Sequence, residues 1–131
     1  MTNKELIEYW IKSSDDDYDD MLSIYENKNY TLALFIGHLV IEKLIKGIYA
    51  KNNVQQPYAR NQHKLLLLAE GAKIKLTEEQ ERKLVTFDTF NISARYEDYK
   101  NNFREKCTKE YTSEQIDNIK EMRTWLKQQL I

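Results

Sequence analysis

Three side chains that can carry charge or move protons recur at four-residue steps near the middle of the sequence. They are His38, Glu42 and Lys46. Four-residue spacing brings side chains to one side of an α-helix, so the three predict a narrow polar stripe. Two interpretations follow from the spacing. The stripe is either a solvated edge held by a Glu42–Lys46 pair, or the lining of a polar groove.

A second group of polar and aromatic residues lies further along the chain, where the hydrophobic periodicity is interrupted. Arginine binds phosphate through two parallel hydrogen bonds, and tyrosine rings offer faces on which bases stack. We therefore expect a ligand-binding surface in which Glu42 orients Arg95 while the surface is empty. The alternative is that these two residues form only a structural ion pair. The candidate binding residues are Glu42, Lys46, Arg95, Tyr96, Tyr99 and Lys100.

Five aspartates between positions 15 and 20, and a single cysteine, are the remaining candidates for chemistry. Aspartates on a continuous helix point in different directions, and no glycine allows the tight loop of a calcium site. We expect a solvated acidic face, no metal site and no cofactor. Cys107 cannot form an internal disulfide, which favours a reducing cytoplasm. Its neighbours Lys106 and Lys109 predict a lowered thiol pKa.

The stripe lies within residues 30–51, and the composition of this segment predicts the kind of element that carries it. This segment is hydrophobic nearly all round, contains no proline and is too long for a buried strand. It predicts a central helix that is packed on several sides. The short polar turn at 27–29 makes it the antiparallel partner of an amphipathic helix over 4–26. We expect its core residues to be Leu39, Ile41, Leu44, Ile45 and Ile48.

Later segments predict shorter helices. An apolar run follows His63 and stops near Gly71, and Thr77 with Gln80 forms a capping box for a helix that continues towards Phe90. Ser113 predicts the start of the last helix. The fold class is therefore all-α, an up-and-down bundle of four to five helices that forms one domain over residues 1–131.

Net charge and hydropathy limit the kinds of partner that the sequence predicts. The 131 residues include 20 basic and 21 acidic side chains, which gives a net charge of −1. No global field attracts the chain to nucleic acid or to a membrane, although a local basic patch is still compatible with this balance. No apolar segment is long enough to span a bilayer, and the N-terminus carries no apolar signal region. We expect a cytoplasmic protein without membrane contact.

Four stretches, in this order and spacing, resemble the HEPN domain family along almost the whole chain. They are residues 10–18, residues 30–47 with Glu42-Lys43 and Lys46-Gly47, residues 63–67, and Arg95-Tyr96. The resemblance implies a helical domain that is often a metal-independent ribonuclease or a toxin, paired with a minimal nucleotidyltransferase antitoxin. It also implies a catalytic arginine that is separated from a histidine by four to six intervening residues, at a homodimer interface.

The sequence departs from that pattern where the family's histidine is expected. Arg95 matches the arginine, but Lys100, Asn101 and Asn102 occupy the histidine positions, and no histidine follows Arg95. We therefore expect a non-catalytic homodimer that binds a nucleotide, RNA or a partner protein such as a minimal nucleotidyltransferase. Its seam is expected near Phe90, Tyr99 or Phe103. The alternative is a divergent metal-independent ribonuclease or toxin, in which His38 or His63 reaches the site from elsewhere.

Overall fold

A computed structural model describes residues 1–53, 64–95 and 97–130, and the side chains of residues 92–98 lie outside this description. Within the described part the chain forms six helices and no strand. The predicted all-α bundle is therefore confirmed, with one helix more than the upper expected number. The helices are α1 (Asn3–Glu26), α2 (Tyr30–Asn52), α3 (Leu65–Gly71), α4 (Glu78–Arg95), α5 (Glu97–Lys106) and α6 (Lys109–Gln128).

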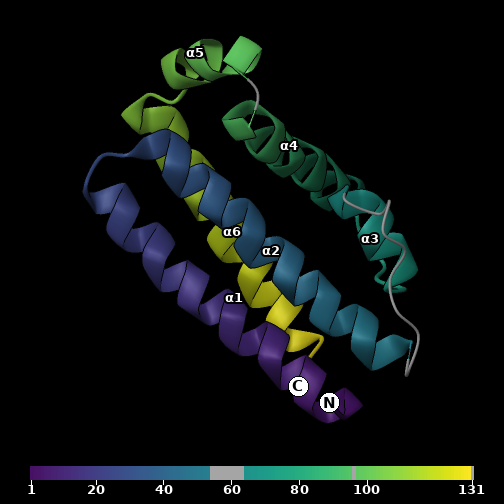
Figure 1. Cartoon of the computed structure of the whole chain (residues 1–131). Helices are drawn as coiled ribbons and strands as arrows, with labels where there is room; N and C mark the ends of the chain where they lie inside the picture. Colours follow the sequence, from purple (N-terminus) through teal and green to yellow (C-terminus); the bar gives the residue numbers. More distant parts are fainter. Residues whose placement is uncertain (54–63, 96, 131) are drawn as a thin grey trace.

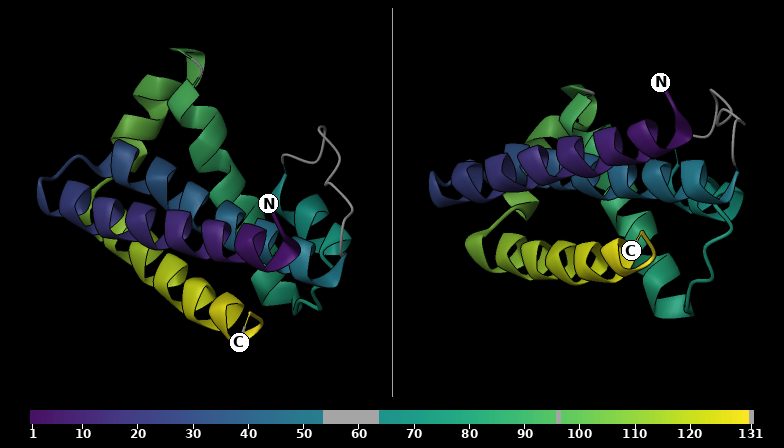
Figure 2. Two further views of the ribbon diagram at one scale, coloured as in Figure 1. Left: turned by 60° about the horizontal axis from the view of Figure 1, so that its bottom comes forward. Right: turned by 90° about the horizontal axis from the view of Figure 1, so that it is seen from below.

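The central position of α2 organises the bundle. In Figure 1, α1 runs beside α2, α6 lies behind it, and α4 with α3 lies on its other side. The further views show α5 turning away at one end of the molecule (Figure 2). The predicted antiparallel pair of α1 and α2 is joined by a turn in which Lys28 adopts a positive φ of 63°. At the other end, Asn3 Nδ2 donates to Ala50 O over 3.0 Å and ties the start of α1 to α2.

Side-chain caps fix where several helices begin. The predicted capping box is present at α4, where Gln80 N donates to Thr77 Oγ1 and Thr77 N donates to Gln80 Oε1. The predicted start of the last helix at Ser113 is wrong. That helix begins at Lys109, and its cap is Thr108, whose Oγ1 accepts from Tyr111 N over 3.1 Å. Ser113 is therefore an interior helical residue, and Thr112 before it is buried.

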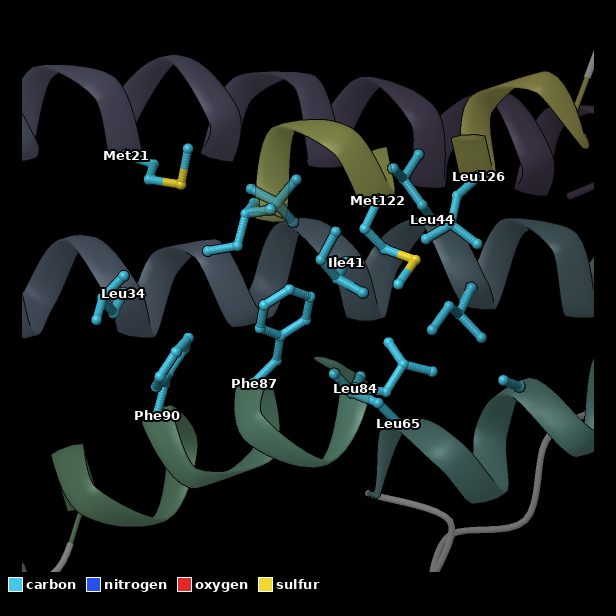
Figure 3. Packing of buried hydrophobic residues seen from close by; sticks show 14 of the residues in the cluster. Met21, Leu34, Ile41, Leu44, Leu65, Leu84, Phe87, Phe90, Met122 and Leu126 are labelled. Carbon is cyan, nitrogen blue, oxygen red and sulfur yellow. The ribbon is translucent and has the colours of Figure 1, made fainter. Parts of the chain in front are cut away.

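Most of the core is built on α2. Ile41, Leu44, Ile45 and Ile48 are at most 1% exposed, as predicted. Figure 3 shows Leu34 and Ile41 facing Phe90 and Phe87 of α4, while Met122 and Leu126 of α6 lie near Leu44. In contrast to the prediction, Leu39 is only partly buried, because its position on the helix turns it out of the core.

Leu39 belongs to the side of α2 that no other helix fully covers, which we call the open face. Its residues follow three- and four-residue steps along the helix, and each is partly or clearly exposed. No helix in the described residues combines the length and apolar character that a bilayer span needs. The open face consists of Leu32, Phe35, Leu39, Glu42, Lys46 and Tyr49.

Candidate functional site

His38 does not share the open face with Glu42 and Lys46. Its side chain is 1% exposed, and its Nε2 lies 3.6 Å from Oδ1 of Asp88 on α4. The predicted stripe of three is therefore wrong. Because an α-helix has 3.6 residues per turn, each four-residue step rotates the side chain by about 40°. Two steps are enough to move from the α4 side of α2 to the open face.

Asp88 is the residue on the α4 side that sequence reasoning missed. Its two carboxylate oxygens accept from Leu65 N over 3.1 and 3.2 Å, at the start of α3. The Asp88 carboxylate therefore holds the first turn of α3 while it faces His38. The available signal was its spacing, since an acidic residue four positions after buried Leu84 falls on the core side of the helix.

Glu42 and Lys46 do lie together, as the four-residue spacing predicted. Lys46 Nζ is 3.8 Å from Glu42 Oε2, and the two side chains are only 16% and 18% exposed. Lys46 Nζ also lies 5.0 Å from the centre of the Trp10 ring on α1. Burial of their aliphatic parts against the bundle explains why a charged pair on the open face is largely covered.

The remaining predicted site residues belong to the end of α4 and to α5. Arg95 is the last residue of α4, but its side chain lies outside the described part, and so does Tyr96. Tyr99 is 54% exposed and Lys100 is exposed, both on α5. Whether Glu42 orients Arg95 stays a prediction.

The register of α2 against α4 shows where these groups stand along the bundle. The His38–Asp88 contact, together with Leu34 lying near Phe90, shows that the two helices are antiparallel (Figure 3). Arg95 lies seven residues beyond Asp88, towards the N-terminal half of α2. Lys46 lies eight residues beyond His38, in the opposite direction. At 1.5 Å per residue, the backbones at Lys46 and Arg95 are about 20 Å apart along the bundle.

Two of the three residues expected at a dimer seam are not available on the surface. Phe90 is fully buried and Phe103 is 6% exposed, with their ring centres 5.9 Å apart in the core. These two rings join α4 to α5 within the chain and are not open to a partner, and the homodimer with a seam near one of the three residues stays a prediction. Tyr99 alone of the three is exposed.

The pKa of the Cys107 thiol is raised, and not lowered as its lysine neighbours predicted. Burial raises the pKa of the Cys107 thiol from its ordinary 9.0 to about 11, and a hydrogen bond from Thr112 and the charge of Lys106 oppose this only in part. The thiol is 6% exposed and free of any disulfide. At neutral pH it is a protonated core group and not a nucleophile.

Basic partners occupy part of the acidic segment of α1. Asp15 accepts from Arg123 and Lys127 of α6 over 3.1 and 3.0 Å, and Asp17 lies 2.6 Å from Lys43 of α2. These pairs fasten α1 to its two neighbours. Across the described ranges, no group of three acidic, histidine or cysteine side chains is placed to hold a metal ion.

His38 is the only histidine in the part of the chain that the structure describes, because His63 lies outside it. The His38 imidazole is enclosed between α2 and α4, and neither ring nitrogen has a hydrogen-bond partner there. A ligand on the surface cannot contact it. As the structure stands, the His38 ring is not presented to the surface.

Comparison with known proteins agrees with the arrangement of helices and with the resemblance seen in the sequence. The profile of the HEPN domain family matches residues 7–129, nearly the whole chain. Searches of curated proteins and of solved structures found no match. By the extent of the family match and its all-helical fold, the chain belongs to the HEPN domain family.

Proposed function

We propose that this HEPN domain is a homodimeric binding module that holds RNA or a nucleotide by its phosphates and releases it uncleaved. The observation that carries the proposal is the enclosure of His38. The sequence has no histidine after Arg95, and the described alternative is 1% exposed against Asp88.

The residues at the end of α4 and on α5 have the chemistry to bind an anion with a base attached. Arg95 would take a phosphate through two hydrogen bonds, and Lys100 would add positive charge, while Lys46, about 20 Å away along the bundle, would contact a phosphate further along an RNA strand. The exposed ring of Tyr99 offers a stacking surface for a base. Glu42, which is already beside Lys46, would hold that cation in place when no ligand is bound.

Cleavage requires a group that removes the proton of the attacking hydroxyl. General-base catalysis contributes about 10²–10⁴ in rate, and histidine supplies it most often because its pKa is near neutral. At the position where the family has histidine, this chain has Lys100. A lysine side chain is ordinarily protonated at neutral pH, so it strengthens phosphate binding without accepting a proton.

A protein partner is the second candidate, and one surface supports it. Leu67 and Val85 are 45% and 54% exposed on α3 and α4. Beside them is a hollow of about 590 Å³ lined by Leu66, Glu78, Glu81, Arg82, Val85 and Thr86. A hollow lined by two apolar residues, two glutamates, an arginine and a threonine suits a protein segment better than a phosphate, because its carboxylates repel an anion. A minimal nucleotidyltransferase would be the partner to test, in a toxin–antitoxin-like pair.

Binding to end-labelled single-stranded RNA and to labelled ATP, followed by fluorescence anisotropy, tests the main proposal. We expect Arg95→Ala to weaken binding of both. Arg82→Ala is the matched control, because it removes the same charge from an exposed position on the same helix. Equal binding by the two variants, or no binding by the native protein, would contradict the proposal.

Light scattering of the same samples tests the dimer. The proposal expects twice the chain mass at micromolar concentration, and an alanine at Tyr99 is expected to weaken the association. The free thiol of Cys107 supports a reducing, cytoplasmic location for this complex. A monomeric mass across the concentration range would count against the homodimer and leave the ligand-binding part to be judged separately.

A further inference from the structure

We propose that Tyr9 and Trp10 on α1 form a second binding station, which stacks an unpaired base of a single-stranded RNA whose phosphates reach Lys46. This inference rests on the proposed function and extends it, because it adds α1 to the site and makes a strand of several nucleotides the ligand, in place of a mononucleotide.

The first support is the arrangement of the two aromatic rings. Tyr9 is 50% exposed, although it is a large aromatic side chain on a helix that packs against other helices of the bundle. Its ring packs edge-on against Trp10, with 5.1 Å between ring centres and 69° between ring planes. Edge-on packing holds the Tyr9 ring in place while it leaves surface open to solvent. A held, exposed ring is what base stacking requires.

The second support is the anchoring of Trp10. A Cβ placed on Gly47 would lie 3.5 Å from Trp10 Cβ, so the α1 backbone at Trp10 packs closely on α2. Lys46 Nζ lies over the ring of Trp10 at 5.0 Å. The aromatic pair and Lys46 therefore form one contiguous surface that joins α1 to the open face of α2.

The third support is the distribution of charge. Lys12 lies three residues after Tyr9, on the neighbouring surface of the helix, and its side chain is 80% exposed. Of the aspartates that follow, Asp16 is paired with Lys12 and Asp17 with Lys43. The basic groups nearest the aromatic pair are Lys12 and Lys46, while Glu5 and Glu8 are exposed acidic neighbours on the same helix. An RNA phosphate would therefore compete with Asp16 for Lys12 and with Glu42 for Lys46.

One binding station is at Arg95, and the other is at Tyr9, Trp10 and Lys46. The distance between them determines the length of ligand that can contact both. The backbones at Lys46 and Arg95 are about 20 Å apart along the bundle, which is several times the ~3.4 Å rise per nucleotide of a stacked strand. A strand of several nucleotides can contact both stations, whereas a mononucleotide occupies only one.

The test uses Trp10 as its own reporter, since the chain contains only one other tryptophan, Trp125. In a Trp125→Phe variant, we expect single-stranded RNA of about 12 nucleotides to quench the remaining fluorescence, because a base stacks beside Trp10. ATP, which is too short to reach from Arg95, is expected to leave it unchanged. In the reciprocal Trp10→Phe variant, RNA is expected to leave the fluorescence of Trp125 unchanged.

Substitution at Tyr9 provides the second readout. Tyr9→Ala should weaken RNA binding by about fivefold or more, the effect of removing one stacked base, and should leave ATP binding unchanged. Tyr9→Phe keeps the ring and should restore native affinity. Circular dichroism of both variants checks that neither substitution at this half-exposed position has changed the fold.

The outcomes separate this inference from the proposed function. If RNA binds, depends on Arg95, and is indifferent to Tyr9 with no change at Trp10, the second station is wrong while the binding module stands. If the native chain binds neither RNA nor ATP, the proposed function fails and the station fails with it. Quenching by RNA together with selective loss in Tyr9→Ala supports both.

Discussion

His38 Nε2 on α2 lies 3.6 Å from Asp88 Oδ1 on α4, with the histidine side chain 1% exposed and the aspartate 15% exposed. The same carboxylate accepts from Leu65 N at the start of α3. One acidic side chain thus connects three helices around the single described histidine. A histidine in this position contributes to packing, and its side chain is 1% exposed.

Removing the Asp88 carboxylate should therefore destabilise the fold. We expect Asp88→Ala to lower the free energy of unfolding by about 1–2 kcal/mol, because the Leu65 N–H at the start of α3 loses its acceptor. Asp88→Asn keeps one acceptor oxygen and should cost less. Urea denaturation measures both. Equal stability of the alanine variant and the native chain would show that Asp88 does not hold α3.

The two glycines of α2 make a matched pair for testing helix packing. A Cβ on Gly37 would collide with Ile119 Cδ1 on α6 and lie 3.1 Å from Met21 Sδ, and both neighbours are fully buried. Gly37→Ala should therefore cost about 1–3 kcal/mol, the usual cost of overpacking a core.

Gly47→Ala is the control, since its Cβ would meet only ordinary contacts of 3.5 Å and longer. Replacing a mid-helix glycine by alanine should then be neutral or should stabilise by up to about 1 kcal/mol. Thermal or urea melts of the two variants should move in opposite directions. A shift of the same sign and size in both would contradict the close approach of α2 and α6 at Gly37.

Cys107 gives a prediction about pH. Burial raises its thiol pKa in the folded chain to about 11 from an ordinary 9.0. The folded state therefore keeps the proton at pH values where the unfolded chain releases it. This contribution to stability is complete below about pH 9 and is lost as the pH rises towards about 11.

The rate of thiol labelling measures the same burial of Cys107. Near pH 8 the native chain should react with a disulfide reagent far more slowly than the chain unfolded in guanidinium, because the thiolate is the reacting form. Comparing the pH dependence of unfolding with that of Cys107→Ala isolates the thiol from Tyr111, whose pKa is also raised by burial. Fast labelling of the native chain would mean that the Cys107 side chain is accessible and ionised.

The elements that could be predicted from the sequence are those fixed by local signals. The central helix followed from its apolar composition, and the cap at Thr77 followed from Gln80 three residues later. Local signals were ambiguous at the last helix, where both Thr108 and Ser113 have capping chemistry. The structure has its cap at Thr108, and Thr112 one turn further on is buried in the packed bundle, which no local signal indicates.

The candidate site was harder to predict because it depends on the rotation and register of whole helices. Four-residue spacing grouped His38 with Glu42 and Lys46, but the drift of about 40° per step sends His38 to another side of α2. The contact of Lys46 with Trp10 joins residues 36 positions apart in the sequence, and no local pattern indicates it.

Restoring the family's spacing offers a gain-of-function test of the site. Lys100→His places a histidine five residues after Arg95 and supplies the group that the native chain lacks. We expect this variant to acquire metal-independent cleavage of RNA, provided that Arg95 is intact. Absence of cleavage in Lys100→His with RNA binding retained would show that the end of α4 lacks the geometry for the reaction.

Incubation of the native protein with a mixed-sequence RNA pool in the presence of a metal chelator tests the central claim most directly. Because general-base catalysis is worth about 10²–10⁴ in rate, its absence should leave the RNA intact at the background rate. The account predicts RNA that is bound in an Arg95-dependent manner and recovered at full length. Cleavage by the native chain that disappears in Arg95→Ala would contradict it and would make the protein a ribonuclease.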